Sequence, residues 1–158
     1  DDVAAATGSQ PTDFRLTSPP IDVGVVERAA RAATGGRFPL PDSRSLTTFR
    51  HATSGEEVTQ GVLLYDDPAQ AAALDAIASP LLGSSFGLLS EPIDLDGASD
   101  ARRWTRTGYE AVTFRVAGLV GFVGTTDTRD PARAERLAGR LRDRMLAMPT
   151  ATVAPSTR

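Results

Sequence analysis

The sequence contains no cysteine, lysine or asparagine, and it has a single histidine, His51. The absence of cysteine excludes disulfides, thiolate metal sites and thiol catalysis. One histidine leaves little room for a histidine-based metal site, so we expect neither a metal nor a cofactor. Long apolar runs are also missing: the stretch 116–123 is interrupted by Gly118 and Gly121, whereas a membrane-spanning helix needs roughly 20 apolar residues. At most, we expect a peripheral association with membranes.

What is present is typical of one globular domain. The chain has 158 residues, of which 41% are hydrophobic and 23% charged, and a single hydrophobic core commonly serves about 100 to 200 residues. All 17 basic residues are arginine, and alanine is the commonest residue. This usage indicates a GC-rich genome, so arginine clusters carry less functional weight here than in a chain that also uses lysine.

The charges are distributed unevenly along the chain. Residues 1–100 contain 6 arginines and 15 acids, whereas residues 101–158 contain 11 arginines and 5 acids. We expect the two halves to pack against each other; the alternative is a basic face offered to an acidic protein or to lipid headgroups. Nucleic acid is not an expected partner, because the net charge is −3 and no basic patch with interleaved aromatic residues is found.

Composition divides the chain into three parts. Residues 1–20 are rich in Ala, Thr, Ser, Asp and Pro, so they are predicted to form a flexible tether. Residues 21–148 are predicted to form a single domain, and residues 149–158 a flexible tail.

Within the domain, helical spacing and capping residues predict helices over about 23–33, 67–80 and 130–148. Alternating and apolar runs predict strands over 45–52, 58–65, 101–107, 111–116 and 119–125. Short turns join most of these strands, and in the turn Ala117-Gly118 the glycine is expected to supply a positive φ. The predicted fold is therefore α+β: an antiparallel sheet of four to five strands with about three helices on one face, in the order α-β-β-α-β-β-β-α.

Three local patterns have a possible chemical meaning, but each lacks part of its signature. The run 83–87 fits G-x-S-x-G, yet a helix precedes it and His51 lies upstream, so a loop is the better interpretation. Asp94, Asp96 and Asp100 offer oxygen ligands for calcium without a closing glutamate, which favours a solvated turn. His51 itself is expected on a strand, at the surface or partly packed.

Two groups of residues are candidates for a weak ligand or partner surface, and no catalytic residue is identified. Four arginines recur at spacings of 3 and 4 in the last helix, which predicts either a solvated face or a docking stripe for an acidic protein or phospholipid: Arg133, Arg136, Arg140 and Arg144. The second group consists of Trp104, Phe114 and Phe122. These aromatic residues would line a pocket if the sheet curled into the ferredoxin-like barrel of a small dimeric enzyme acting on an aromatic substrate.

Three segments carry a resemblance to a known class of proteins. The run 61–74 (GVLLYDDPAQAAAL), the run 112–120 (VTFRVAGLV) and a closing helix from Ala134 to Met145 resemble small extracytoplasmic domains of actinobacterial lipoproteins. In those domains a strand leads into an alanine-rich helix, and a hairpin precedes the last helix. The resemblance implies attachment to the cell envelope through a lipidated cysteine upstream of Asp1, with no known catalysis.

Together these observations predict a non-enzymatic extracytoplasmic binding or accessory domain, anchored to the envelope through its N-terminal tether. Its expected ligand is an apolar molecule held between sheet and helices, or a partner protein of the envelope. The barrel enzyme described above and an accessory subunit of a larger membrane complex are the alternatives. The sequence leaves the ligand and the oligomeric state open.

Overall fold

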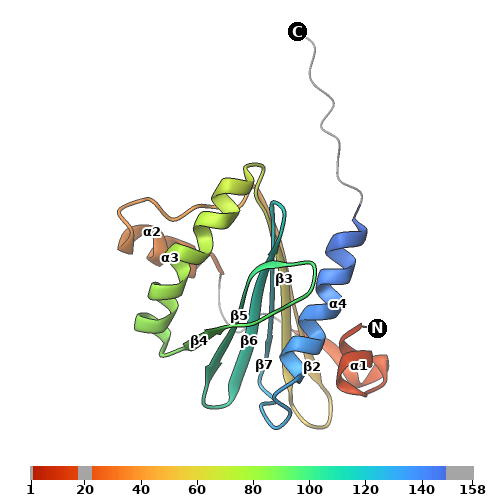
Figure 1. Ribbon diagram of the computed structural model, residues 1–158. Helices are drawn as coiled ribbons and strands as arrows, with labels where there is room; N and C mark the ends of the chain where they lie inside the picture. Colours follow the sequence, from red (N-terminus) through yellow and green to blue (C-terminus); the bar gives the residue numbers. More distant parts are fainter. Residues whose placement is uncertain (1, 18–22, 149–158) are drawn as a thin grey trace.

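The computed structural model describes residues 2–17 and 23–148. Its helices are α1 (Asp2–Thr7), the 3-10 turn η1 (Pro11–Asp13), α2 (Val23–Ala33), α3 (Pro68–Phe86) and α4 (Arg133–Ala147). Its strands are β1 (Phe14–Thr17), β2 (Ser43–His51), β3 (Glu57–Leu64), β4 (Leu89–Pro92), β5 (Ser99–Arg106), β6 (Tyr109–Val116) and β7 (Leu119–Thr125). Figure 1 shows the sheet in the middle of the molecule with helices on both sides of it.

All seven strands form one antiparallel sheet in the order β1-β2-β3-β7-β6-β5-β4. Short turns join β2 to β3, β5 to β6 and β6 to β7, as expected for antiparallel neighbours. The central pair, β3 and β7, unites the two halves of the chain, with Gly61 opposite Phe122 and Val58 opposite Thr125.

The two faces of the sheet are covered by different helices. Val123 packs in the core cluster that includes α4, whereas Val120, three residues earlier on the same strand, packs with α3. Since successive side chains of a strand point to opposite faces, α4 and α3 lie on opposite faces (Figure 1). Helix α1 lies beside α4 and contacts it.

The face under α4 holds the larger core. The residues that α4 buries recur at helical spacing and form one stripe: Ala134, Leu137, Ala138, Leu141 and Met145. Beneath them Val58, Val112 and Phe114 are almost fully buried. The Phe114 ring occupies the space over Gly121, where an added Cβ would come within 2.4 Å of it.

On the other face, α3 packs mainly through its first turns. Asp67 caps the helix by accepting a hydrogen bond from the amide of Ala69 at 2.9 Å, and Ala71 and Leu74 pack with Tyr65 and Val120. The helix continues beyond the predicted end at Pro80 and reaches Phe86. Proline removes only one backbone hydrogen bond, and Pro80 and Ala76, four residues earlier, are both exposed, so water can satisfy the freed carbonyl.

The α+β class is confirmed, but the details of the predicted sheet are corrected. The sheet has seven strands rather than four or five, and the helices cover both faces rather than one. The five predicted strands are present within two residues of their expected ends; β1 and β4 were missed. Both missed strands have only four residues and form the two edges of the sheet, and β4 contains Pro92. Short edge strands carry weak alternation and tolerate proline.

The prediction of a flexible tether over residues 1–20 is wrong for residues 2–17. These residues form α1, η1 and β1, and Val3, Ala4 and Ala6 are at most 5% exposed. The short apolar residues of α1 gain burial by contacts with α4, with η1 and with the core of the sheet, which composition does not reveal. Residues 18–20 and the predicted tail, 149–158, lie outside the described residues.

The β6–β7 turn has two residues, as predicted, but the roles of those residues are exchanged. The positive φ, 52°, belongs to Ala117, and Gly118 is not among the residues with positive φ. Gly118 instead allows a close backbone approach: its carbonyl accepts a hydrogen bond from the Tyr65 amide at 2.9 Å, and an added Cβ would lie 2.6 Å from the Tyr65 carbonyl oxygen.

Candidate functional site

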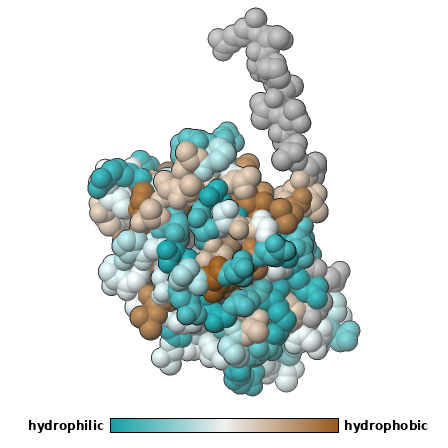
Figure 2. All heavy atoms as spheres, in the orientation of Figure 1, coloured by the Kyte–Doolittle hydropathy of each residue, from teal (hydrophilic) through white to brown (hydrophobic). Residues whose placement is uncertain are grey.

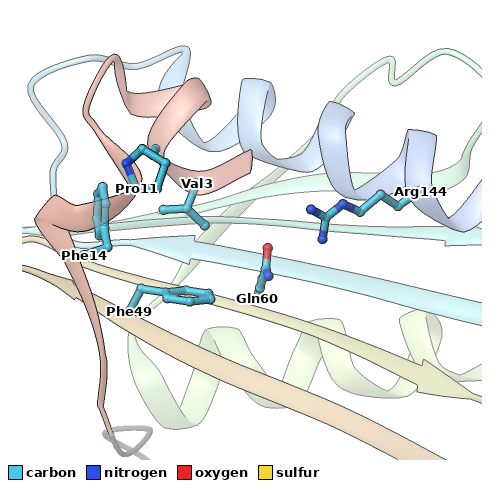
Figure 3. Close-up of a pocket in the computed structure, with 7 residues that line it drawn as sticks. Val3, Pro11, Phe14, Phe49, Gln60 and Arg144 are labelled. Atoms are coloured by element: carbon cyan, nitrogen blue, oxygen red, sulfur yellow. The ribbon is translucent and has the colours of Figure 1, made fainter. Parts of the chain in front are cut away.

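A cavity of about 130 Å³ lies between α1, the first strands of the sheet and α4. Seven residues from six elements line it: Val3, Ala4, Pro11, Phe14, Phe49, Gln60 and Arg144. Figure 3 shows Pro11, Phe14 and Phe49 gathered at one end, while Arg144 reaches toward the space from α4 at the other end. The Gln60 side chain rises from the sheet between the two ends (Figure 3).

Local contacts keep this cavity in shape. Phe14 lies opposite His51 in the β1–β2 pair, and the two rings meet edge to face with centroids 5.0 Å apart. The His51 Nδ1 accepts a hydrogen bond from the Ser54 amide at 3.1 Å, which fixes the ring. His51 is thus a partly packed residue at the end of a strand, as the sequence suggested.

Helix α1 forms the roof of the cavity. Its last turn is closed by the Thr7 hydroxyl, which donates to the carbonyl of Val3 at 2.9 Å, and by the Ser9 amide, which donates to the carbonyl of Ala4 at 2.9 Å. Arg136 on α4 donates to the carbonyl of Ala6 at 3.4 Å. These contacts hold a six-residue helix that would not be stable on its own.

The four arginines of the predicted stripe have different roles. Arg133 and Arg136 form ion pairs within the molecule, with Glu56 and Asp127 and with Asp130 respectively. Arg144 lines the cavity. Arg140 is exposed, and no ion pair joins it to another described residue. The stripe is therefore not one uniform docking surface, because α1 and the acids near the start of α4 occupy part of it.

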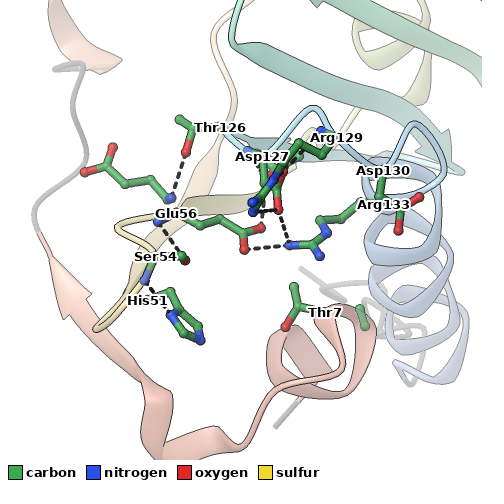
Figure 4. A network of polar contacts seen from close by, with 12 residues as sticks. Thr7, His51, Ser54, Glu56, Thr126, Asp127, Arg129, Asp130 and Arg133 are labelled. Carbon is green, nitrogen blue, oxygen red and sulfur yellow. Dashed lines mark hydrogen bonds and ion pairs between the residues drawn. The ribbon is translucent and has the colours of Figure 1, made fainter.

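Arg133 belongs to a buried polar network, shown in Figure 4. Its Nη1 lies 2.6 Å from Glu56 Oε2 and 3.0 Å from Asp127 Oδ2. Glu56 also accepts a hydrogen bond from the Thr125 hydroxyl at 3.0 Å. Arg129 pairs with Asp127 through two hydrogen bonds of 2.8 Å. Every carboxylate in this network therefore has a cationic partner, as burial of charge requires.

The network holds Asp127 ionised. The hydrogen bond from Arg129 lowers the pKa of Asp127 to about 2, against the opposing effect of burial. Since the folded state lowers this pKa below its usual value of 3.8, the ionised carboxylate stabilises the fold above about pH 4. This contribution is lost as the pH falls toward 2.

A second ionic cluster centres on Arg103. Its guanidinium contacts the carboxylates of Glu91 and Glu135 and lies 3.1 Å from Glu110 Oε1. Glu110 is 4% exposed, and burial raises its pKa despite the nearby Arg103 charge. Arg103 therefore joins the end of the sheet to the first turn of α4 and compensates the buried charge of Glu110.

The three aromatic candidates do not all line one pocket: Trp104 and Phe114 both line a small cavity of about 50 Å³ beside α3, but Phe122 does not. Trp104 is 2% exposed and donates from Nε1 to the Thr113 hydroxyl at 2.9 Å. By register, Phe122 lies opposite Thr113 and shares the α3 face with Trp104, whereas Phe114 is buried on the α4 face. The pocket that the barrel-enzyme hypothesis requires is therefore not formed by these three residues.

The other chemical motifs of the sequence have structural roles. Asp94 and Asp96 are exposed in the β4–β5 connection, whereas Asp100 lies at the start of β5 and pairs with Arg115 at 2.7 Å. In the part of the chain that the structure describes, no group of three or more His, Asp or Glu residues could hold a metal ion. The run 83–87 ends α3, with Gly87 in the left-handed conformation as the C-cap. It is a helix end and not a strand-to-helix elbow.

Sequence reasoning missed the cavity because it missed the elements that form it. Four of the seven lining residues lie within the segment predicted to be a tether: Val3, Ala4, Pro11 and Phe14. The alternation of Phe14 and Leu16 was the one available signal, and it marks β1. Gln60 and Phe49 belong to no sequence motif. Whether they line a cavity depends on which elements pack together, and local sequence patterns do not contain that information.

None of the helices in the described residues is long and apolar enough to cross a membrane. No family model, no curated protein and no solved structure matches this chain.

Proposed function

We propose that this chain is a non-enzymatic binding domain and that the cavity under α1 holds a small apolar ligand. The observation that supports this is the cavity itself, about 130 Å³ in volume with five apolar residues among the seven that line it. In other proteins an enclosed cavity of about 150 Å³, lined by apolar side chains alone, takes up a benzene molecule; the cavity under α1 has a similar volume but is partly open and includes two polar side chains. The space is therefore adequate for one small ring or a short hydrocarbon chain.

The chemistry of the lining favours binding over catalysis. Its two polar side chains are the amide of Gln60 and the guanidinium of Arg144. An amide does not titrate, and a guanidinium keeps its proton at any physiological pH, so neither exchanges protons with a substrate. Such groups orient a ligand by hydrogen bonds and charge.

We further propose that the domain acts outside the cytoplasm, attached to the cell envelope of an actinobacterium. The support is the resemblance of residues 61–74 and 112–120 to lipoprotein domains. Because α1 packs against α4, the attachment point is expected upstream of Asp1. The gene sequence that precedes Asp1 tests this: a leader ending in a lipidation cysteine is expected, and a cytoplasmic domain in its place would contradict the proposal.

The binding function is tested with toluene, a neutral ring of suitable size. Isothermal titration of the chain with toluene is expected to give saturable binding to one site. Ala4→Leu is expected to abolish this binding, because Ala4 lines the cavity and is 2% exposed, so a larger side chain occupies the space of the ligand.

Ala72→Leu is the matched control, since Ala72 is exposed on α3 and its replacement leaves the cavity unchanged. The control variant is expected to bind toluene as the wild type does. No saturable binding to the wild type, or equal binding by Ala4→Leu, would refute the proposal. Circular dichroism establishes that both variants are folded.

A further inference from the structure

One end of the cavity is formed by two aromatic rings. Phe14 on β1 and Phe49 on β2 share a face of the sheet as diagonal neighbours, because Phe49 lies opposite Leu16, two residues after Phe14. Both phenylalanines line the cavity. Figure 3 shows their rings nearly edge-on, one upright and the other flat, so the faces of both rings border the same space. This end of the cavity is therefore a corner with two flat aromatic walls.

The wall formed by Phe14 is oriented by His51, a residue that does not itself line the cavity. The rings of Phe14 and His51 meet edge to face, with centroids 5.0 Å apart and an interplanar angle of 84°. The His51 ring is held in turn by its Nδ1, which accepts hydrogen bonds from the amides of Ser54 and Thr53 at 3.1 and 3.3 Å. The Phe14 ring is therefore in position before a ligand enters, which reduces the cost of ordering it on binding.

A corner of this kind suits an aromatic ligand better than a saturated ligand of similar size. Aromatic rings attract each other beyond the burial of area when they stack with an offset or meet edge to face. Between two flat walls, a planar ring can stack on one wall while its edge points at the other. A saturated ring is puckered and has no π system, so it gains only dispersion contacts from either wall.

We propose that the cavity selects aromatic rings over saturated hydrocarbons, and that Phe14 and Phe49 determine this specificity. The volume of about 130 Å³ is close to the roughly 150 Å³ that holds benzene in another protein, so the ligand has a single ring. Gln60 and Arg144 lie away from the corner (Figure 3), so the selection does not depend on them. This inference rests on the proposed binding function and specifies its ligand class.

The test compares toluene with methylcyclohexane, its saturated counterpart, by headspace gas chromatography, which suits volatile and sparingly soluble hydrocarbons. The wild type is expected to bind toluene more tightly, although toluene is the less hydrophobic of the two. In Phe49→Leu the ratio of the toluene to the methylcyclohexane association constant is expected to fall about threefold to tenfold, because one aromatic contact is removed. The change in this ratio between proteins cancels the different desolvation of the two ligands.

Phe14→Leu provides a second, independent variant and is expected to lower the ratio by a similar factor. Phe38→Leu is the matched control, because Phe38 packs with the cluster under α3 on the opposite face of the sheet, and its ratio is expected to stay within about twofold of the wild type. Circular dichroism establishes that all three variants are folded.

Two results would overturn the inference: a wild type that binds methylcyclohexane as tightly as toluene, or a ratio that is unchanged in both Phe14→Leu and Phe49→Leu. Saturable binding of toluene would still stand in either case, so failure of the ligand class is distinguishable from failure of the binding function.

Discussion

At the scale of single residues, the β6–β7 turn shows how a correct prediction can have the wrong cause. Ala-Gly is a reasonable hairpin turn because glycine tolerates positive φ. In the structure the strained position is Ala117, with φ of 52°, and Gly118 is required by the backbone of Tyr65. The turn is therefore fixed by a tertiary contact between Gly118 and Tyr65, which lies just before α3.

This assignment predicts opposite effects for two substitutions in the turn. Gly118→Ala is expected to lower the free energy of unfolding by about 1–3 kcal/mol, because the new Cβ is forced against the Tyr65 carbonyl. Ala117→Gly is expected to raise it by up to about 1 kcal/mol, because it relieves a left-handed conformation at alanine. Urea unfolding followed by the fluorescence of Trp104 measures both. A destabilised Ala117→Gly with an unaffected Gly118→Ala would reverse the two roles.

The candidate residues also show what a spacing pattern can and cannot predict. The arginine spacing correctly placed Arg133, Arg136, Arg140 and Arg144 on one side of a helix. It could not predict that Glu56, 77 positions earlier than Arg133, would be brought within hydrogen-bonding distance. Ion-pair partners follow from the topology of the sheet, which local patterns do not contain.

At the scale of elements, strong helical periodicity in the sequence was sufficient to predict a helix. The predicted helix over 23–33 matches α2, and the clear amphipathic pattern gave α4. Elements that depend on neighbours were missed: α1 is six residues long, and β1 and β4 have four residues each. Their stability comes from packing and from strand pairing rather than from propensity. Since α1, η1 and β1 contribute four of the seven residues that line the cavity, the sequence analysis that missed these elements also missed the site.

The packing of α1 gives a test that separates a folded segment from a tether. Val3→Asp is expected to lower the free energy of unfolding by at least about 2 kcal/mol, because Val3 is 5% exposed and belongs to the core. Thr12→Asp, at an exposed position in the same segment, is the control and is expected to change it by less than about 0.5 kcal/mol. Equal, negligible effects in urea unfolding would mean that the segment is not packed.

At the scale of the whole molecule, the opposite charges of the two halves are brought together, as the sequence suggested. Arg102 pairs with Asp75 at 3.1 Å and Arg133 with Glu56 at 2.6 Å, each joining the second half to the first. The central contact of β3 with β7 produces this arrangement. Much of the basic charge of the second half is therefore used in ion pairs within the molecule. Figure 2 shows hydrophilic residues over much of the visible face, with hydrophobic residues in separate small patches.

The cavity is likewise a property of the whole molecule, since six elements contribute to it. Nuclear Overhauser effects on the toluene complex test its occupancy most directly. The account predicts intermolecular effects between toluene protons, the methyl groups of Val3 and the ring of Phe49, both of which line the cavity. Effects that instead reach Leu74 and Val120, on the opposite face of the sheet, or no effects at saturating toluene, would contradict it.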